Sequence, residues 1–172
     1  MAGFLILLFI FFAFQMQAQT AVPREYQVKA VFLYNFTQFV EWPAAVFTGP
    51  SEPFIIGILG NDPFGLYLDQ TLTGENKMGH PMIVQRFKDV KDISNCHILF
   101  ISQPEQESEA LAVTKSRSIL TVSDISDFLS QGGMVRFFNK DNRIRFQINP
   151  TAAKTGNLII SSKLLRLADI YD

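Results

Sequence analysis

The sequence predicts an α/β fold: a three-layer sandwich in which a mostly parallel mixed sheet is flanked by helices and carries a C-terminal antiparallel hairpin at its edge. Several short apolar runs are β-branched or aromatic and nearly free of charge, which suits strands covered on both faces. Helical stretches at 63–73 and 105–115 separate these runs, and this alternation favours a parallel sheet. The runs are "FIIGIL" (54–59), "HILFIS" (97–102) and "SILTVS" (118–123), with a further strand at 82–87.

The hairpin is predicted from the segment "GGMVRFFNKDNRIRFQIN", residues 132–149. The residues "NKDN" form a turn between two strands, and in the second strand Arg143, Arg145 and Gln147 alternate with large apolar residues. Such alternation is typical of an antiparallel strand with one face in water. Basic side chains on the wet face also discourage edge-to-edge aggregation.

The first helix is predicted over Pro23 to Glu41, and Pro43 ends it because the residue before a proline is pushed out of the α region. On a helical wheel, one side collects core candidates and the other collects polar residues. The core candidates are Tyr26, Val28, Phe32, Leu33, Phe36, Phe39 and Val40, and the polar side holds Gln27, Thr37, Gln38 and Glu41. Tyr34 lies in the middle of the polar side and Val31 near its margin. These two are either single exposed apolar residues, which are common, or a small strip for partner contact.

Two further helices are expected near the C-terminus. Ser123 and Asp124 resemble the cap of a helix "ISDFLSQ" (125–131), which the glycine pair that follows would end. The closing segment "SSKLLRLADIY" (161–171) predicts a short amphipathic helix with Ser161 or Ser162 as its N-cap.

The N-terminus reads as a signal peptide. Residues 3–14, "GFLILLFIFFAF", carry no charge and are followed by the small and polar segment "QMQAQTAVP". A membrane-spanning helix needs about 20 apolar residues, so this run is too short to span. We expect residues 1–19 to be a signal peptide, cleaved between Ala18 and Ala21, and residues 20–172 to form one domain of an exported protein. The alternative is an uncleaved anchor.

The charge is balanced overall but unevenly distributed. The chain has 172 residues and a formal net charge of −1, which gives no general argument for binding nucleic acid or an anionic membrane. Residues 20–133 hold 8 basic and 13 acidic side chains, whereas residues 134–166 hold 7 basic and 1 acidic. The C-terminal third is therefore basic on a mildly acidic body.

The segment "GNDPFG" (60–65) has the spacing of a phosphate-binding loop after a strand, but the working positions are wrong. Leu66 and Tyr67 stand where a Lys and a Ser or Thr would reach phosphate and metal. We interpret the segment as a turn into a helix, with Asp62 as its cap and Pro63 at its first position.

No other constellation of reactive residues forms a recognisable site. His80 lies in a loop and His97 starts a strand beside Cys96, and neighbouring strand residues point to opposite faces. Cys96 is the only cysteine, so no disulfide forms within the chain; it is either a small buried hydrophobe or an exposed thiol that links two chains. No serine lies in a nucleophile elbow. We expect no catalytic residue, no cofactor and no bound metal.

Seven segments resemble the YfiR family in order and spacing, over Tyr26 to Ala168. Each is a core or turn pattern with little specificity by itself, but seven in order are hard to obtain by chance. The segments are "YQVKAVFLYNFTQFVEWP", "FIIGILGNDPFG", "HILFIS", "ILTVSD", "GGMVRFF", "RFQIN" and "LIISSKLLRLA".

The resemblance implies a non-enzymatic periplasmic regulator with a compact α/β domain, often dimeric. Such a protein restrains an inner-membrane diguanylate cyclase, or another membrane sensor, by binding its periplasmic part, and an outer-membrane lipoprotein relieves the restraint. The redox control linked to cysteine pairs in the family does not carry over, because this chain has only Cys96. A nucleotide-using α/β enzyme and a periplasmic small-ligand-binding protein are the alternatives.

We expect the partner to contact Val31 and Tyr34 on the first helix together with Arg136, Arg143 and Arg145 on the hairpin. Tyrosine is favoured at interfaces because it joins a large apolar ring to a hydrogen-bonding end. The basic excess supplies a field that steers an acidic partner surface. The alternative is a solubilising sheet edge and one exposed tyrosine.

Overall fold

The computed structural model describes residues 21–47, 49 and 51–172, so the expected signal peptide lies outside the described residues. Its main sheet has eight strands in the order β10-β8-β7-β6-β5-β2-β4-β3. The strands are β2 (Phe54–Leu59), β3 (Asn76–Lys77), β4 (His80–Phe87), β5 (Ile98–Ile101), β6 (Leu120–Ser123), β7 (Val135–Lys140), β8 (Arg143–Ile148) and β10 (Asp169–Ile170). β4, β2, β5, β6 and β7 run parallel, whereas β8 is antiparallel to β7 and β3 to β4. The predicted α/β class with a mixed, mostly parallel sheet is confirmed.

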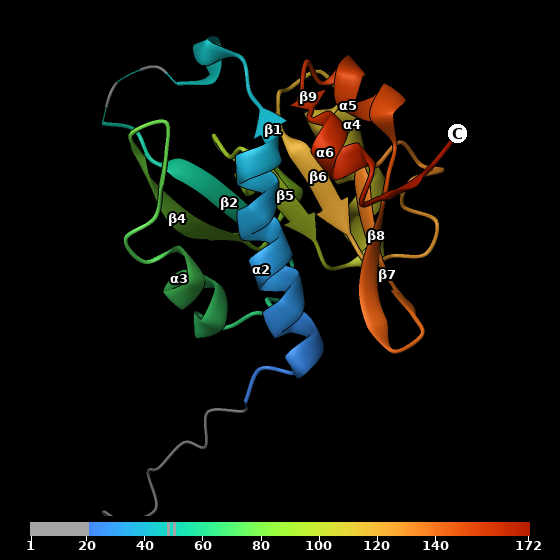
Figure 1. Cartoon of the computed structure of the whole chain (residues 1–172). Helices are drawn as coiled ribbons and strands as arrows, with labels where there is room; N and C mark the ends of the chain where they lie inside the picture. The colour runs from blue at the N-terminus through green and yellow to red at the C-terminus, as the bar shows by residue number, and fades with distance from the viewer. Residues whose placement is uncertain (1–20, 48, 50) are drawn as a thin grey trace, which may run out of the picture.

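Helices cover both faces of this sheet. The helices are α2 (Arg24–Phe39), α3 (Leu66–Leu72), α4 (Pro104–Thr114), α5 (Pro150–Thr155) and α6 (Ser162–Leu165), with the 3-10 turns η1 (Ala44–Val46) and η2 (Val90–Asp92). Buried residues of α2, α3, α5 and α6 share one core cluster, and those of α4 and η2 share the other. Within β5, Ile98 and Phe100 join the first cluster while Leu99 and Ile101 join the second, as strand alternation requires. In Figure 1, α2 runs across the front of the sheet and the β7–β8 hairpin extends at its right-hand side.

The buried side of α2 is rotated from the one predicted by the helical wheel. Thr37 is fully buried and its Oγ1 donates to the Tyr34 carbonyl at 2.7 Å, so its polar group is satisfied inside the helix. Val28 was expected in the core but is 38% exposed. Hydrophobicity alone placed both residues wrongly. Thr37 can be buried at little cost because its hydroxyl is bonded within the helix.

The helix also ends earlier than predicted. Val40–Glu41 form the short strand β1, which pairs antiparallel with β9 (Ile159–Ile160). The C-terminal segment thereby closes over the end of α2.

Near the C-terminus the helical predictions were partly wrong. Residues 126–132 form consecutive turns where a helix at 125–131 was predicted, although the Ser123 hydroxyl does accept from Ile125 N at 3.2 Å. The closing helix α6 has only four residues and is followed by β10; of the two candidate caps, Ser161 is the N-cap. The unpredicted helix α5 follows Asn149, whose side chain accepts from Ala152 N, and has Pro150 at its start. Both are ordinary start signals for a helix.

Candidate interaction surfaces

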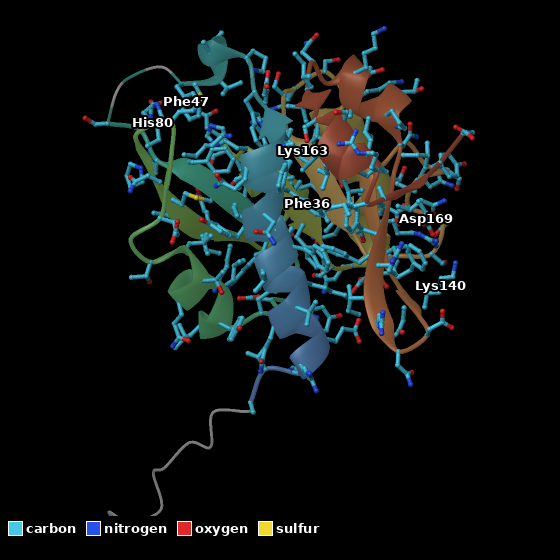
Figure 2. All side chains as sticks on the ribbon, viewed as in Figure 1. Phe36, Phe47, His80, Lys140, Lys163 and Asp169 are labelled. Atoms are coloured by element: carbon cyan, nitrogen blue, oxygen red, sulfur yellow. The ribbon has the colours of Figure 1, made fainter. Side chains whose placement is uncertain are left out.

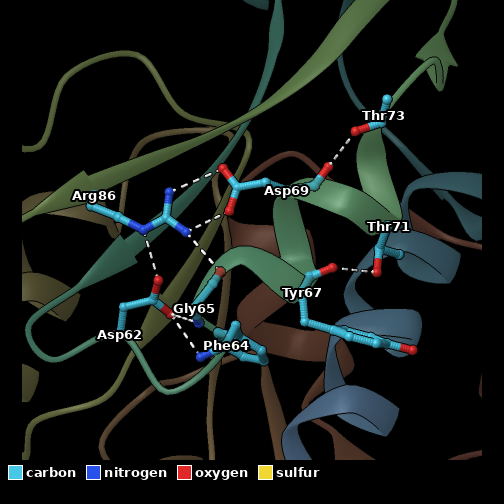
Figure 3. A network of polar contacts seen from close by, with 8 residues as sticks. All are labelled: Asp62, Phe64, Gly65, Tyr67, Asp69, Thr71, Thr73 and Arg86. Carbon is cyan, nitrogen blue, oxygen red and sulfur yellow. Dashed lines mark hydrogen bonds and ion pairs between the residues drawn. The ribbon is translucent and has the colours of Figure 1, made fainter. Parts of the chain in front are cut away.

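The backbone of the "GNDPFG" segment is hydrogen-bonded to protein side chains (Figure 3). Asp62 Oδ1 accepts from the backbone N–H groups of Phe64 and Gly65 at 2.7 and 3.2 Å. Asp62 therefore caps the turn as predicted, but α3 starts only at Leu66. Because the carboxylate occupies these two N–H groups, they are not free to hold a phosphate.

Arg86 of β4 locks the same turn onto the sheet. Its Nε donates to Asp62 Oδ2 at 2.7 Å, and its Nη2 donates to Asp69 Oδ2 at 2.6 Å and to the Gly65 carbonyl at 2.9 Å. The hydrogen bond to Asp69 is the main cause that raises the pKa of Arg86. The network is a clamp between β4, the turn and α3.

The two histidines lie in an aromatic stack. The Phe47 ring lies 4.0 Å from the ring of His80 and 4.8 Å from that of His97, which in turn stacks on Phe54 at 4.4 Å. His80 was expected in a loop, but it begins β4 and is buried. Phe47 and His80 lie side by side in Figure 2.

A hydrogen bond fixes the state of the His97 ring. His97 Nδ1 accepts from Ile55 N at 3.0 Å, so this nitrogen carries no proton. Burial, followed by the charge of His80, lowers the pKa of His97 to about 4. Cys96 points to the other face of the sheet, as predicted, where burial raises its pKa to about 12. It is a buried hydrophobe. In the part of the chain that the structure describes, no group of three or more His, Cys, Asp or Glu is placed to hold a metal ion.

A buried ion pair lies where β6 ends. Lys29 of α2 is 2% exposed and its Nζ donates to Asp124 Oδ2 at 2.6 Å and to Glu25. The Tyr26 hydroxyl donates to the same Asp124 oxygen at 3.1 Å, and burial, helped by Asp124, raises its pKa to about 12. These groups satisfy one another, so the cluster anchors the start of α2 to the sheet.

Val31 is exposed on α2, whereas Tyr34 packs against the core cluster and does not lie in the middle of a polar side as predicted. Val31 is 42% exposed and lines a groove of about 300 Å³. The other lining residues are Arg24, Gln27, Val28, Phe32, Asn35 and Tyr67. Tyr34 is half-buried, and its hydroxyl donates to Glu75 Oε2 at 2.7 Å, which raises its pKa. Sequence reasoning missed Val28 and Tyr67, because the first was assigned to the core and the second comes from α3.

The three hairpin arginines have different surroundings. Arg143 and Arg145 are exposed, and Arg145 Nη2 lies 3.8 Å from Asp169. Arg136 is half-buried; its Nη1 donates to the Ser126 carbonyl at 2.6 Å and its Nη2 to Gln147 Oε1 at 3.2 Å. Arg136 is therefore engaged within the fold, whereas the other two are accessible.

Val31 and Tyr34 of α2 lie on one face of the sheet, and the hairpin arginines point to the other. Phe36 of α2 stacks on Phe137 with ring centroids 5.8 Å apart and meets Phe146 edge-on at 5.3 Å. Arg136 and Arg145 are the strand neighbours of these two phenylalanines, so their side chains point away from α2. The structure brings Val31 near Tyr34 and Arg143 near Arg145, but it does not join the two pairs into one surface.

The fold is an α/β domain with helices on both faces of a mixed sheet, a groove beside Val31 and exposed arginines on the hairpin. A family model described as YfiR/HmsC-like matches residues 26–169, and the chain belongs to this family. The family consists of periplasmic, regulatory proteins without enzymatic activity and is linked to diguanylate cyclases. A comparison with curated proteins gives no match.

Across the described residues, no helix combines the length and the apolar character needed to cross a membrane.

Proposed function

We propose that the chain is an exported, non-enzymatic regulator that binds the periplasmic part of an inner-membrane signalling protein, in the first place a diguanylate cyclase, and represses it. The observation that carries this proposal is the family match, which extends over residues 26–169. The charge-free run at residues 3–14 supports export through a signal peptide at 1–19, with the domain at 20–172. The same proposal includes an outer-membrane lipoprotein that sequesters the regulator. It also includes a homodimer of this chain.

The contact residues proposed for the partner are Val31 and Tyr34 on one face of the sheet and Arg136, Arg143 and Arg145 on the other. Val31 and the groove beside it offer apolar area, and Tyr34 adds a ring with a polar end. Arg143 and Arg145 offer exposed positive charge. Arg136 lies on the same face of the hairpin and is held by its hydrogen bond to the Ser126 carbonyl.

The proposal is tested by intact mass and by cellular signalling. Protein recovered from the periplasm should have the mass of a chain that lacks residues 1–19, within the interval of cleavage from Ala18 to Ala21. Deleting the gene should raise cyclic di-GMP, and re-expressing the full chain should lower it again. A full-length mass would contradict cleavage of the signal peptide, and unchanged cyclic di-GMP in the deletion strain would contradict repression.

A cavity of about 440 Å³ between α4 and α5 favours small-ligand binding as the second candidate. Leu111, Met134 and Ala152 give it an apolar lining, and Thr121 and Asn149 add polar groups. Its volume lies within the usual range of small-molecule sites, roughly 300–1,000 Å³. A bound ligand at 100 times its dissociation constant would stabilise the fold by about 2.7 kcal/mol. A thermal shift with a metabolite mixture, abolished by Ala152→Trp, would favour this candidate.

A further inference from the structure

The hairpin carries a phenylalanine that the core does not use. Phe138 lies on the outer face of the hairpin, which we define as Arg136, Phe138 and Lys140 of β7 with Arg143, Arg145 and Gln147 of β8. Among the phenylalanines of the described residues, Phe138 alone packs in neither core cluster. Its chain neighbour Phe137 is buried against α2, and so is Phe146, the cross-strand partner of Phe137. Folding therefore accounts for the inward rings but not for Phe138.

Two guanidinium groups flank this ring. The Arg136 guanidinium lies 5.5 Å from the centroid of Phe138 and is held there by its bonds to Ser126 and Gln147. Arg145 is the direct cross-strand partner of Phe138. The ring is thus half-buried between a fixed arginine and an accessible one.

The end of the outer face is a hollow rich in positive charge. Lys140, Arg143 and Arg145 line a hollow of about 400 Å³, together with the single acidic residue Asp141. All four side chains are exposed. The nearby Asp169 approaches Arg145 only to 3.8 Å, which leaves most of the hydrogen-bonding capacity of this guanidinium unused.

We propose that the outer face of the hairpin binds an acidic protein surface, with carboxylates on Lys140, Arg143 and Arg145 and an apolar partner side chain against Phe138. The proposal rests on the proposed function, because it names the chemistry by which the regulator recognises its partner. Guanidinium groups bind carboxylates through paired hydrogen bonds. Aromatic residues and arginine are also the types enriched at the energetic centre of protein interfaces.

The position of the ring favours a protein over a lipid bilayer. Phe138 lies in the middle of a strand, whereas the hairpin tip is formed by Asp141 and Asn142. A hairpin that inserts into a bilayer needs apolar side chains at its tip, and an acidic tip is repelled by anionic lipid. A protein surface has no such requirement, since it can approach the flat face.

Fluorescence anisotropy of labelled synthetic peptides tests the proposal with the full mature chain. One probe is a 15-residue peptide of alternating Glu and Ser with a central Leu, and a second probe has Gly in place of that Leu. We expect Arg143→Glu/Arg145→Glu to weaken binding of the Leu peptide about tenfold or more, and added salt to weaken the wild type. The control Lys154→Glu/Lys163→Glu makes the same change in net charge on α5 and α6 and should bind like the wild type.

Phe138→Ala tests the ring separately. The wild type should prefer the Leu peptide to the Gly peptide by about fivefold, and the variant should lose this preference while its circular dichroism stays native. Equal binding by the wild type and Arg143→Glu/Arg145→Glu, or no binding by the wild type, overturns the proposal. Tighter binding to phosphatidylglycerol vesicles than to the Leu peptide overturns it in favour of a membrane surface.

The proposed function and this proposal fail in different experiments. If the gene deletion leaves cyclic di-GMP unchanged, the regulatory function is wrong whatever the peptides bind. If Arg143→Glu/Arg145→Glu restores repression as well as the wild type, the function stands and the outer face is not the contact.

Discussion

The two faces of the β7–β8 hairpin use phenylalanine in opposite ways. On the inner face, Phe137 and Phe146 are buried and meet Phe36 of α2 at centroid distances of 5.8 and 5.3 Å. On the outer face, Phe138 is half-buried, lies outside both core clusters and is flanked by arginine. The residue type is the same on both faces. The inner rings are covered by α2, whereas the outer ring is only flanked by arginine side chains.

This comparison separates residues that stabilise the fold from residues that are free to bind. A ring enclosed on all sides contributes its full transfer free energy and leaves a cavity when removed. A ring that is partly exposed contributes less to folding and keeps its exposed part available for a partner.

The largest expected effect is on the inner side of this comparison. Phe36→Ala should lower the free energy of unfolding by about 3–5 kcal/mol, because the ring is fully buried among Phe32, Phe137 and Phe146. Denaturant unfolding measures the change through the midpoint. A loss below about 1 kcal/mol would show that the inner rings are not the core that the structure indicates.

The buried ring of His97 makes the free energy of unfolding depend on pH. The pKa of His97 is about 4 when folded and 6.5 unfolded, so between these values the unfolded chain binds a proton that the native chain does not. Stability should therefore fall by up to about 3 kcal/mol as the pH drops from 6.5 to 4 and should not change further below 4 through this residue. Trp42, the only tryptophan, reports this change, since its Nε1 donates to the His97 carbonyl at 3.1 Å.

His97→Asn is the matched variant, because its side-chain oxygen keeps an acceptor for Ile55 N. Denaturant unfolding followed by Trp42 fluorescence should show a flatter pH dependence for the variant than for the wild type. Identical slopes would mean that other groups cause the acid sensitivity.

The clamp at Arg86 should give a smaller effect. Its side chain is 39% exposed, so solvent screens the ion pairs with Asp62 and Asp69. We expect Arg86→Ala to cost roughly 1–2 kcal/mol, mostly through lost hydrogen bonds to charged groups. Hydrogen exchange should show faster exchange at Phe64 and Gly65, and Arg86→Lys should recover only part of the protection. Unchanged exchange would contradict a clamping role.

The smallest effect is expected on the outer face. Phe138→Ala should change the free energy of unfolding by no more than about 1 kcal/mol, because the ring packs in neither core cluster. The same denaturant titration that measures Phe36→Ala provides the comparison. A loss equal to that of Phe36→Ala would remove the distinction between the two faces.

The sequence was sufficient for the class of fold and for the six longer strands of the main sheet, since charge-free runs and strict alternation report burial directly. It did not predict the two-residue strands β1, β3, β9 and β10. It was not sufficient for the side of α2 that is buried. Thr37 and Lys29 are buried because of a local hydrogen bond and a distant ion pair with Asp124, and neither partner is visible in a helical period. The segment 125–131 was expected to be a helix, but residues 126–132 lie in turns, where the Gly133 N–H donates to the Phe128 carbonyl at 2.9 Å and the Phe128 ring packs against Gly133.

The candidate contact residues were predicted individually but not as a surface. Alternation placed Arg143 and Arg145 on the wet face of the hairpin, where the structure has them. That α2 covers the opposite face is a property of the tertiary packing, so the separation of Val31 and Tyr34 from the arginines required the structure. Phe138 was overlooked because an aromatic residue within a strand is ordinarily assigned to the core.

Cellular cyclic di-GMP in a deletion strain tests most directly whether the outer face of the hairpin carries the regulatory contact. The strain is complemented in turn with the wild-type chain, with Arg143→Glu/Arg145→Glu and with the control Lys154→Glu/Lys163→Glu, each recovered from the periplasm in equal amount. We predict that the wild type and the control return cyclic di-GMP to its low level, and that Arg143→Glu/Arg145→Glu leaves it high. Full restoration by Arg143→Glu/Arg145→Glu would contradict the account.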